Sequence, residues 1–364
     1  MEIKFACNRI SWLDFVRTIA ICFVVLVHCT EGVYYFHLDG IGKEDLIVKI
    51  FAFTLFTIGR LGVPLFFLLT GYLFLDRDWS DSENIAGFYR KNLLGLFITS
   101  EIWVVFYNFY FTYFYARAFD LRLLLENMLF LKDVEMRYMW QHTGFGHMWY
   151  IPVILGVYMF IPFIARAIYG VNYKLLIFVS FFVICLCFVI PTINVVLKAM
   201  HIRQISKALY MWFSGGSYGF YIILGFLCKK NIFKNIKYKF ICGISIISLV
   251  IAVWLQIFSY SLGIRYNIWY DSLPLALLAL CIFELASRYD RHEFANVFTI
   301  LAKYSFGIFF LHAPIRILCL QYIQLQSRVL LLIVVCLICI MLSTAIIYIF
   351  KWTPWLRRLL FYIS

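Results

Sequence analysis

The chain has 364 residues, of which 64% are hydrophobic and 14% charged, and its mean hydropathy is +0.88. These values exclude an ordinary soluble domain, in which apolar residues make up only about half of the chain. The formal net charge of +13 does not require a nucleic-acid partner, because basic residues gather on the cytoplasmic face of membrane proteins.

The apolar stretches have the length of helices that cross a bilayer, roughly 20 residues. Transmembrane β-strands would instead alternate apolar and polar residues over about ten positions. We therefore predict an all-α polytopic membrane protein that forms one integral domain over residues 1–364. About ten spans are predicted, near residues 11–31, 55–75, 92–115, 147–166, 174–193, 208–228, 240–259, 269–287, 305–323 and 329–350. The apolar stretch 46–59 either extends the second span outward or lies along the interface, which would make eleven.

The distribution of lysine and arginine predicts the orientation of the spans. With the N-terminus inside, the inner segments carry more of these residues than the outer ones, including the cluster KKNIFKNIKYK at 229–239. Both termini are then expected in the cytoplasm.

The first span carries four ionisable side chains on one stripe, Asp14, Arg17, His28 and Glu31. At 100° per residue, the eleven steps from Arg17 to His28 bring the helix back to within about 20° of its starting direction. Both side chains therefore face the same way, about 16 Å apart along the axis. Ionisable groups at membrane depth are costly unless they face a cavity or a partner. The stripe predicts a functional site, with a packing role for His28 as the alternative; Asp14 is expected to pair with Arg17.

The second span contains an arginine beside helix-breaking residues. Arg60 precedes Gly62 and Pro64 in the sequence GRLGVPLFF, and Gly and Pro together predict a kink or break. Such an arginine is suited to hold an anionic or polar group; the alternative is that it extends toward the outer headgroups. The polar inner segment that follows carries three further basic residues, Arg77, Arg90 and Lys91.

The fourth and ninth spans each carry a histidine. His147 and Trp149 stand at the outer mouth of the fourth span, near the level of His28, although a Trp at that depth also fits an interfacial belt. In the ninth span His312 and Arg316 are four residues apart and share one helix face. The same stretch begins with Tyr304 and Ser305.

Other polar or sulfur-bearing residues in the spans are expected to be structural. Glu101 and Glu284 are expected to form ion pairs with buried arginines. The eleven cysteines are scattered, and the CxxC spacing of Cys336 and Cys339 falls in the middle of the last span. Buried cysteine usually behaves as a small apolar residue, so we expect no redox or metal site.

Together these stretches resemble the acyltransferase-3 family of bacterial integral membrane O-acyltransferases. The family's motifs are matched, in the expected order, by Asp14, Arg17 and His28, by Arg60, the run 63–67 and Thr70-Gly71-Tyr72, by His147, Trp149, Tyr158 and Pro162, and by Ser305, Gly307, Ile308 and His312. Thr70 stands where the family usually has serine, which affects no expected catalytic role. The resemblance runs from residue 12 into the ninth span. It is nearest to stand-alone members that acetylate surface polysaccharides such as O-antigen or enterobacterial common antigen.

The resemblance implies a membrane-bound O-acetyltransferase of the bacterial inner membrane, with cytoplasmic acetyl-CoA as the acyl donor. The acceptor would be a hydroxyl of a cell-surface polysaccharide or of an undecaprenyl-linked sugar on the outer side. Membrane lipids are the other expected partners, and neither a nucleic acid nor a metal is expected.

The chemistry of acyl transfer assigns roles to these residues. A sugar hydroxyl needs a base, and histidine titrates near neutral pH, so His28 is the expected general base. The tetrahedral oxyanion needs a donor, and Arg60 is expected to stabilise it or to orient the acceptor. Arg17 lies further in and is expected to hold the pantetheine or phosphate part of coenzyme A, with Arg77, Arg90 and Lys91 at its phosphates. The expected supporting residues are Asp14, Glu31, His147, Trp149, Tyr304, Ser305, His312 and Arg316.

Two other classes of function fit parts of this pattern. A transporter or flippase for lipid-linked sugars would also have many spans, Pro-broken helices and buried charges, although the absence of inverted repeats favours the enzyme. A structural partner in a polysaccharide assembly complex would not need the ionisable stripe. Within the enzyme hypothesis, another acyl group such as succinyl and a covalent acyl-histidine relay stay open.

Overall fold

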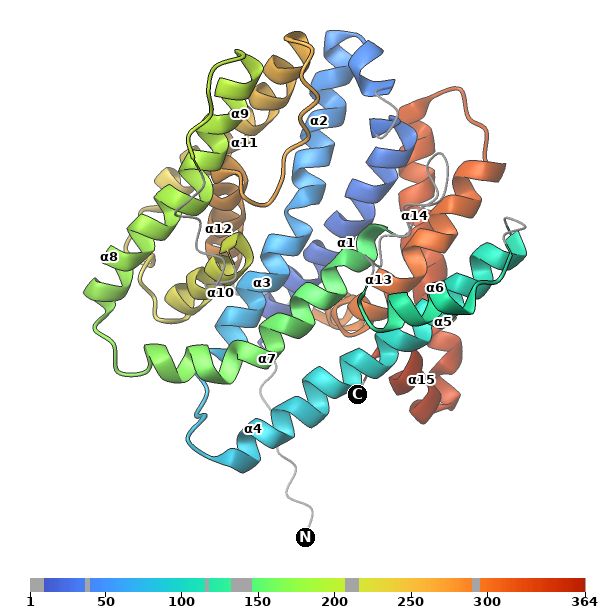
Figure 1. Ribbon diagram of the computed structural model, residues 1–364, viewed down its shortest axis with the longest axis horizontal. Helices are drawn as coiled ribbons and strands as arrows, with labels where there is room; N and C mark the ends of the chain where they lie inside the picture. The colour runs from blue at the N-terminus through green and yellow to red at the C-terminus, as the bar shows by residue number, and fades with distance from the viewer. Residues whose placement is uncertain are drawn as a thin grey trace.

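The computed structural model describes residues 10–363 except 37–39, 115–117, 132–145, 207–215 and 290–294. Every regular element in these residues is helical, as the composition predicts (Figure 1). The α-helices are α1 (Ser11–Val33), α2 (Leu46–Arg60), α3 (Gly62–Phe74), α4 (Ser82–Phe88), α5 (Gly95–Phe114), α6 (Leu121–Met128), α7 (Tyr150–Ile168), α8 (Tyr173–Ile184), α9 (Ile190–Ala199), α10 (Gly216–Lys229), α11 (Tyr238–Ser261), α12 (Leu273–Ser287), α13 (Ala295–Tyr322), α14 (Arg328–Ile349) and α15 (Pro354–Phe361).

Within the described residues, eight helical stretches are long and apolar enough to cross a membrane. Two of the ten predicted spans, 208–228 and 269–287, correspond to the shorter apolar helices α10 and α12, and residues 208–215 lie outside the described part of the chain. The count of ten and the side on which each terminus lies therefore stay predictions. The stretch 46–59 forms α2 and continues directly into α3, so it extends the second span instead of making an eleventh.

The third span begins ten residues earlier than predicted, at Ser82 instead of residue 92. Asp81 caps α4 by accepting a hydrogen bond from the Glu83 backbone N–H at 2.9 Å, and a π-helical turn, Tyr89–Leu94, joins α4 to α5. Hydropathy reveals only the apolar part of such a helix, because its polar first turns look like a loop. Arg90 and Lys91 consequently lie on a helix and not in an irregular segment.

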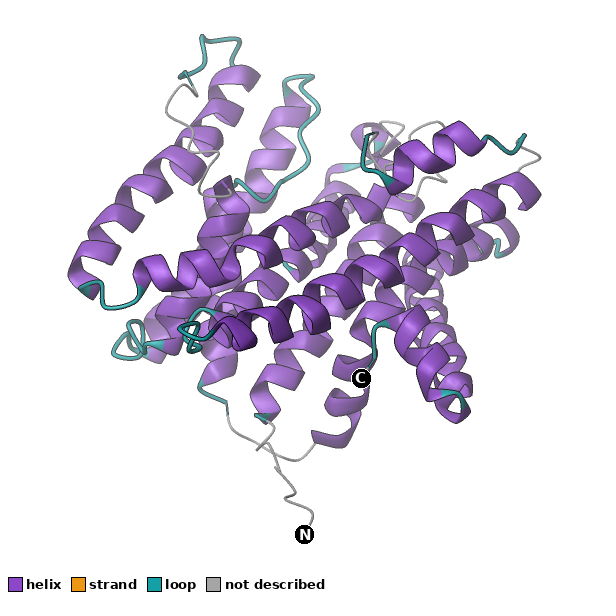
Figure 2. Cartoon of the chain, turned by 60° about the horizontal axis from the view of Figure 1, so that its bottom comes forward, coloured by secondary structure: helices purple, strands orange, loops and turns teal. Residues whose placement is uncertain are grey.

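Helix α1 forms the centre of the bundle. It packs against α13, α2, α3 and α14, and α13 packs in turn against α14 (Figure 1). Figures 1 and 2 show α5 and α7 running obliquely across this group. Most of α1 is buried inside the protein, including Asp14 and Glu31 of the ionisable stripe, whereas Arg17 and His28 are half-buried. A stripe of polar groups on α1 therefore faces other helices and not lipid.

Helices α3 and α10 approach each other closely through two glycines. A Cβ atom at Gly71 would collide with the Ile222 backbone, and one at Gly225 would collide with the Leu68 backbone. Small residues at helix interfaces allow this close contact in membranes, where packing rather than water exclusion drives association. The contact fixes α3, and with it the break at Leu61 that positions Arg60.

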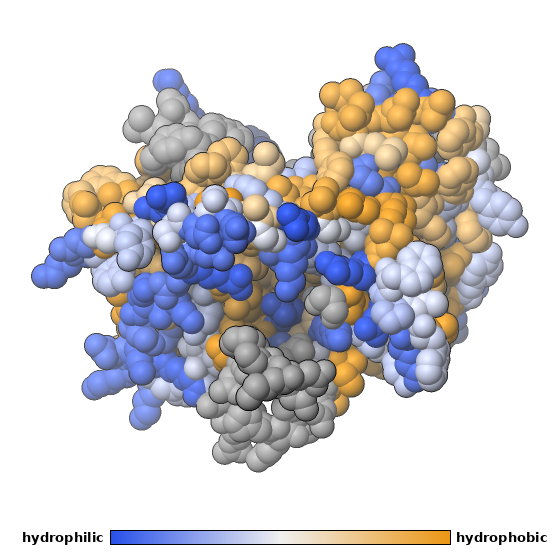
Figure 3. All heavy atoms as spheres, turned by 90° about the horizontal axis from the view of Figure 1, so that it is seen from below, coloured by the Kyte–Doolittle hydropathy of each residue, from blue (hydrophilic) through white to orange (hydrophobic). Residues whose placement is uncertain are grey.

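The outer surface of the bundle separates into apolar and hydrophilic regions. Large apolar side chains are exposed along α8, α11 and α14, for example Phe181, Ile247 and Met341, as expected of lipid-facing helices. Seen from below the view of Figure 1, hydrophilic side chains gather across the middle and left of the face, and apolar ones cover the upper right (Figure 3).

Candidate active site

His28, Glu31 and Arg60 form a connected chain of side chains near the C-terminal end of α1, the end predicted to face outward. Glu31 follows His28 by three residues, and its Oε2 lies 2.8 Å from His28 Nδ1. Its Oε1 accepts a hydrogen bond from Arg60 Nη2 at 2.9 Å. A carboxylate paired with an arginine is ionised and only accepts hydrogen bonds, so His28 Nδ1 carries a proton. The other ring nitrogen, Nε2, is then left with a lone pair that can take a proton.

Arg60 owes its position to the predicted helix break. Helix α2 ends at Arg60 and α3 begins at Gly62. The guanidinium donates to the Tyr270 hydroxyl at 3.2 Å and lies over the rings of Phe56 and Trp269, 4.7 and 4.6 Å from their centroids. Arg60 is only 6% exposed, so the alternative that it extends to the outer headgroups is wrong.

Two further histidines meet His28 in space. The His28 and His312 rings stack with centroids 5.4 Å apart, and His147 lies edge-on to His312 at 4.9 Å and to His28 at 6.0 Å. His28 comes from α1, His312 from α13, and His147 from the 3-10 turn Gly146–Trp149 that precedes α7. The structure thus brings together histidines from three spans that are far apart in sequence.

The hydrogen bonds of His147 and His312 show which ring nitrogen of each carries a proton. The Tyr107 hydroxyl donates to the Phe310 carbonyl at 2.6 Å, so its oxygen accepts from His147 Nε2 at 3.4 Å. His312 Nδ1 donates to the Ile308 carbonyl at 3.1 Å. His312 Nε2 is buried and makes no hydrogen bond with the described residues, so a second imidazole lone pair is available beside His28.

Trp149 and Arg316 flank the histidines. Trp149 packs against Tyr218 and Trp269, with ring centroids 5.6 and 5.8 Å apart, in an aromatic group beside Arg60. It therefore belongs to the site's wall and not simply to an interfacial belt. Arg316 is buried one turn beyond His312 on α13, and its Nη1 donates to the His28 carbonyl at 3.3 Å.

Arg17 lines a separate cavity at the N-terminal half of α1, which we call the inner cavity after the predicted orientation. This cavity has a volume of about 300 Å³ and is lined by polar groups from α1, α13, α7 and the end of the chain, among them Arg17, Tyr158, Lys303, Ser305 and Tyr362. Of the predicted supporting residues, Ser305 lines this cavity. Its neighbour in the sequence, Tyr304, is buried and does not line the cavity.

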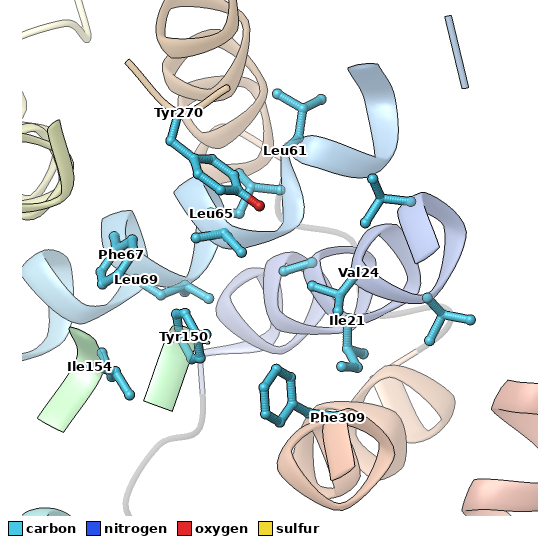
Figure 4. Close-up of a cluster of buried hydrophobic side chains, with 14 of the residues drawn as sticks. Ile21, Val24, Leu61, Leu65, Phe67, Leu69, Tyr150, Ile154, Tyr270 and Phe309 are labelled. Atoms are coloured by element: carbon cyan, nitrogen blue, oxygen red, sulfur yellow. The ribbon is translucent and has the colours of Figure 1, made fainter. Parts of the chain in front are cut away.

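A small apolar void lies next to this cavity. Phe66, Tyr150 and Ser305 line both the cavity and a much smaller void that also touches Phe309. Figure 4 shows Tyr150 and Phe309 meeting beside Ile21 and Val24 of α1, with the two ring centroids 5.7 Å apart. Phe309 in turn lies 5.0 Å from the His147 ring. The inner cavity and the histidines are thus separated by only a few aromatic side chains.

The structure does not place the other predicted donor-binding residues in this cavity. Arg77 is exposed, donates from Nε to the Leu73 carbonyl at 2.9 Å and lies 4.5 Å from the Phe74 ring. Arg90 and Lys91 are exposed on the π-helical turn, and their neighbour Asn92 lines the cavity instead. These three residues do not line the cavity, and anchoring to the membrane would also account for them.

The buried carboxylates divide into paired and unpaired groups. Asp14 accepts a hydrogen bond from Thr299 at 3.0 Å, and its predicted pair with Arg17 stays a prediction. Glu284 pairs with Arg288 at 2.8 Å, which confirms a structural ion pair, although Arg288 is only partly buried. Glu101 differs, because its Oε1 has no hydrogen-bond partner among the described residues, so the expected ion pair is wrong there.

Sequence reasoning missed several residues that complete the site. Tyr107 and the pair Trp269 and Tyr270 are ordinary aromatic residues in an aromatic-rich chain, and no local pattern marks them. Asn92 and Lys303 are single polar residues at span ends. These residues reach the site only through the packing of several helices. The described residues contain no group of three or more His, Cys, Asp or Glu side chains that fits a metal ion.

Comparison with known proteins gives one match. Residues 10–352 match the model of a protein family described as an acyltransferase domain, the acyltransferase-3 type. No curated protein and no solved structure is significantly similar to the chain.

Proposed function

We propose, from the premise that the chain belongs to the acyltransferase-3 family, that this multi-pass membrane acyltransferase moves an acetyl group from acetyl-CoA to a sugar hydroxyl. The family and the eight apolar helices establish a membrane acyltransferase. The proposal adds that the donor is cytoplasmic and the enzyme sits in a bacterial inner membrane. The acceptor is a cell-surface polysaccharide or its undecaprenyl-linked precursor, of the O-antigen or enterobacterial common antigen type.

One observation carries the proposal, the pairing of His28 with Glu31 and Arg60. A base that works in acyl transfer needs a lone pair aimed at the substrate and a partner that holds its other nitrogen. Glu31 supplies that partner at 2.8 Å, and Arg60 keeps Glu31 ionised at 2.9 Å. This carboxylate also stabilises the imidazolium that forms when His28 takes a proton.

The transfer step balances with these groups. The acceptor hydroxyl oxygen bonds to the thioester carbonyl carbon while its proton moves to His28 Nε2. The tetrahedral intermediate then breaks its C–S bond, and coenzyme A leaves as a thiolate that takes the proton back from His28. Direct transfer accounts for every atom, so no acyl-histidine intermediate is needed.

The inner cavity supports the proposed path of the donor. Coenzyme A carries phosphates and a narrow pantetheine arm, and Arg17 with Lys303 would attract its anionic end. A thioester that extended from the cavity past Tyr150 and Phe309 would reach the histidines. The acceptor would meet it from the outer side, beside Trp149 and Arg60.

The test is the acetyl content of surface polysaccharide in cells that express the wild-type chain or His28→Ala at equal membrane abundance. The matched control is His201→Asn, because His201 is exposed and has a positive φ of 57°, which Asn tolerates. We expect acetyl groups with the wild type and the control and none with His28→Ala. Unchanged acetylation would contradict the role of His28, and polymer trapped inside cells that lack the protein would favour a transporter.

A further inference from the structure

The site contains two buried arginines, and only one of them is neutralised. Arg60 pairs with Glu31 at 2.9 Å. Arg316 is 7% exposed, and its only hydrogen bond with the described residues is from Nη1 to the His28 carbonyl oxygen at 3.3 Å. Its Nε is buried without a partner, and no carboxylate of the described residues lies within ion-pair distance. Arg316 therefore keeps a full positive charge and unused N–H donors in the protein interior.

Such a cation is unfavourable unless something compensates it. A buried charge that lacks a counter-ion loses its hydration without regaining it from the protein. Ionisable residues persist inside membrane proteins chiefly where function requires them. Because no described carboxylate compensates Arg316, its N–H donors are able to bind an anion that forms during the reaction.

Arg316 lies between α1 and α13, close to the histidines. Arg316 follows His312 by one helical turn on α13, and its hydrogen bond to the His28 carbonyl holds it against α1. A Cβ atom at Gly32 would stand only 3.0 Å from Nη1, so the missing side chain of Gly32 leaves room for the guanidinium against α1. The stacked rings of His28 and His312 lie on the same seam between the two helices.

Arg60, the other buried arginine, is less able to bind a further anion than Arg316. The positive charge of Arg60 is already engaged by Glu31, and its guanidinium is enclosed by Phe56, Trp269 and Tyr270. Glu31 is in turn shared between Arg60 and His28. Arg60 consequently has little capacity to accommodate a second negative charge.

We propose that Arg316 is a catalytic residue that binds the oxyanion of the tetrahedral intermediate, which rests on the acyl-transfer function proposed above. When the acceptor hydroxyl attacks, the carbonyl π electrons move to oxygen, and the free N–H groups of Arg316 donate to that oxygen. When the C–S bond breaks, the electrons return to re-form the carbonyl. Arg60 then serves as a positioning residue that acts through Glu31.

Kinetics of the purified enzyme in vesicles, with acetyl-CoA and acceptor polysaccharide, test this assignment. The variants are Arg316→Gln and Arg316→Lys, and the control is Arg203→Gln, which changes an exposed arginine. We expect Arg316→Gln to lower kcat about 10²–10³-fold, the usual effect of removing one oxyanion donor, with both KM values within about twofold. Arg316→Lys should recover part of kcat, because it restores the charge but not the fork of donors.

Thermal unfolding separates a catalytic from a structural role. Removing an uncompensated charge should leave Tm of Arg316→Gln equal to or above that of the wild type, whereas an arginine that holds the fold would lower it. The proposal is overturned if kcat of Arg316→Gln stays within about fivefold. It is also overturned if the loss appears only in a KM, because the anion would then be a substrate carboxylate or phosphate. If the wild type itself transfers no acetyl group, the proposed function is wrong. If the wild type is active and Arg316→Gln is equally active, only the role of Arg316 is wrong.

Discussion

At the C-terminal half of α1, His28 and Glu31 are held by side chains from other helices, whereas at the N-terminal half Arg17 opens onto a cavity that Lys303 also lines. The outer group is buried, and its members fix one another's protonation and orientation. The inner group is spread out, as suits a large flexible cofactor. We interpret the His28 group as the centre of catalysis and the Arg17 cavity as the donor-binding region. Substitutions in one region should therefore leave the function of the other unchanged.

The largest effect is expected from His28→Gln. The change removes the proposed base, so kcat should fall about 10²–10⁴-fold. Binding of acetyl-CoA should stay unchanged, because Arg17 and the inner cavity are untouched. Steady-state kinetics measure kcat, and calorimetry measures acetyl-CoA binding. An equal loss of kcat and of donor affinity would show that the two regions do not act separately.

Arg60→Gln is expected to destabilise the protein strongly. The substitution leaves Glu31 buried without its arginine, which costs about 3–5 kcal/mol. The double variant Arg60→Gln with Glu31→Gln should recover part of this loss, because it removes both charges. Thermal unfolding of the four proteins in detergent measures the coupling, and additive losses would show that the two side chains do not depend on each other.

Arg17→Gln should weaken donor binding without affecting the chemical step. Loss of one charge-assisted contact to coenzyme A corresponds to about a tenfold rise in the KM for acetyl-CoA. Because His28 and its partners are unchanged, kcat should remain within about twofold. A large drop in kcat with an unchanged donor KM would place Arg17 in the chemistry instead.

The smallest effect is expected from Arg90→Gln and Lys91→Gln. Both side chains are exposed and neither lines the inner cavity, and exposed charges contribute about 0–1 kcal/mol to an interaction. The donor KM should rise less than about threefold for each. A rise as large as that of Arg17→Gln would extend the donor site to the π-helical turn.

Patterns along one helix were predictable, and contacts between helices were not. The spacing of Arg17 and His28 and the break after Arg60 follow from helical geometry and from Gly62 with Pro64. The meeting of His28 with His147 and His312 depends on how three spans pack, for which sequence offered only a family resemblance. Which arginine Glu31 would neutralise was equally hidden, because several buried arginines compete and only the fold decides.

The same limit explains the errors in helix length. The start of the third span was placed too late because the first turns of α4 are polar. The cost of an unpaired carboxylate in a membrane predicts an arginine for Glu101, but no described residue pairs with its Oε1. Hydropathy measures the cost of burying a residue and carries no information about its neighbours.

The most direct test of the account is the sidedness of the reaction in sealed proteoliposomes of known protein orientation. Labelled acetyl-CoA, which does not cross the bilayer, is supplied on one side, and acceptor polysaccharide on the other. The account predicts transfer only when acetyl-CoA is on the side that exposes Arg90 and Lys91 and the acceptor is on the opposite side. Transfer that requires both substrates on one side would contradict a path from the Arg17 cavity to His28.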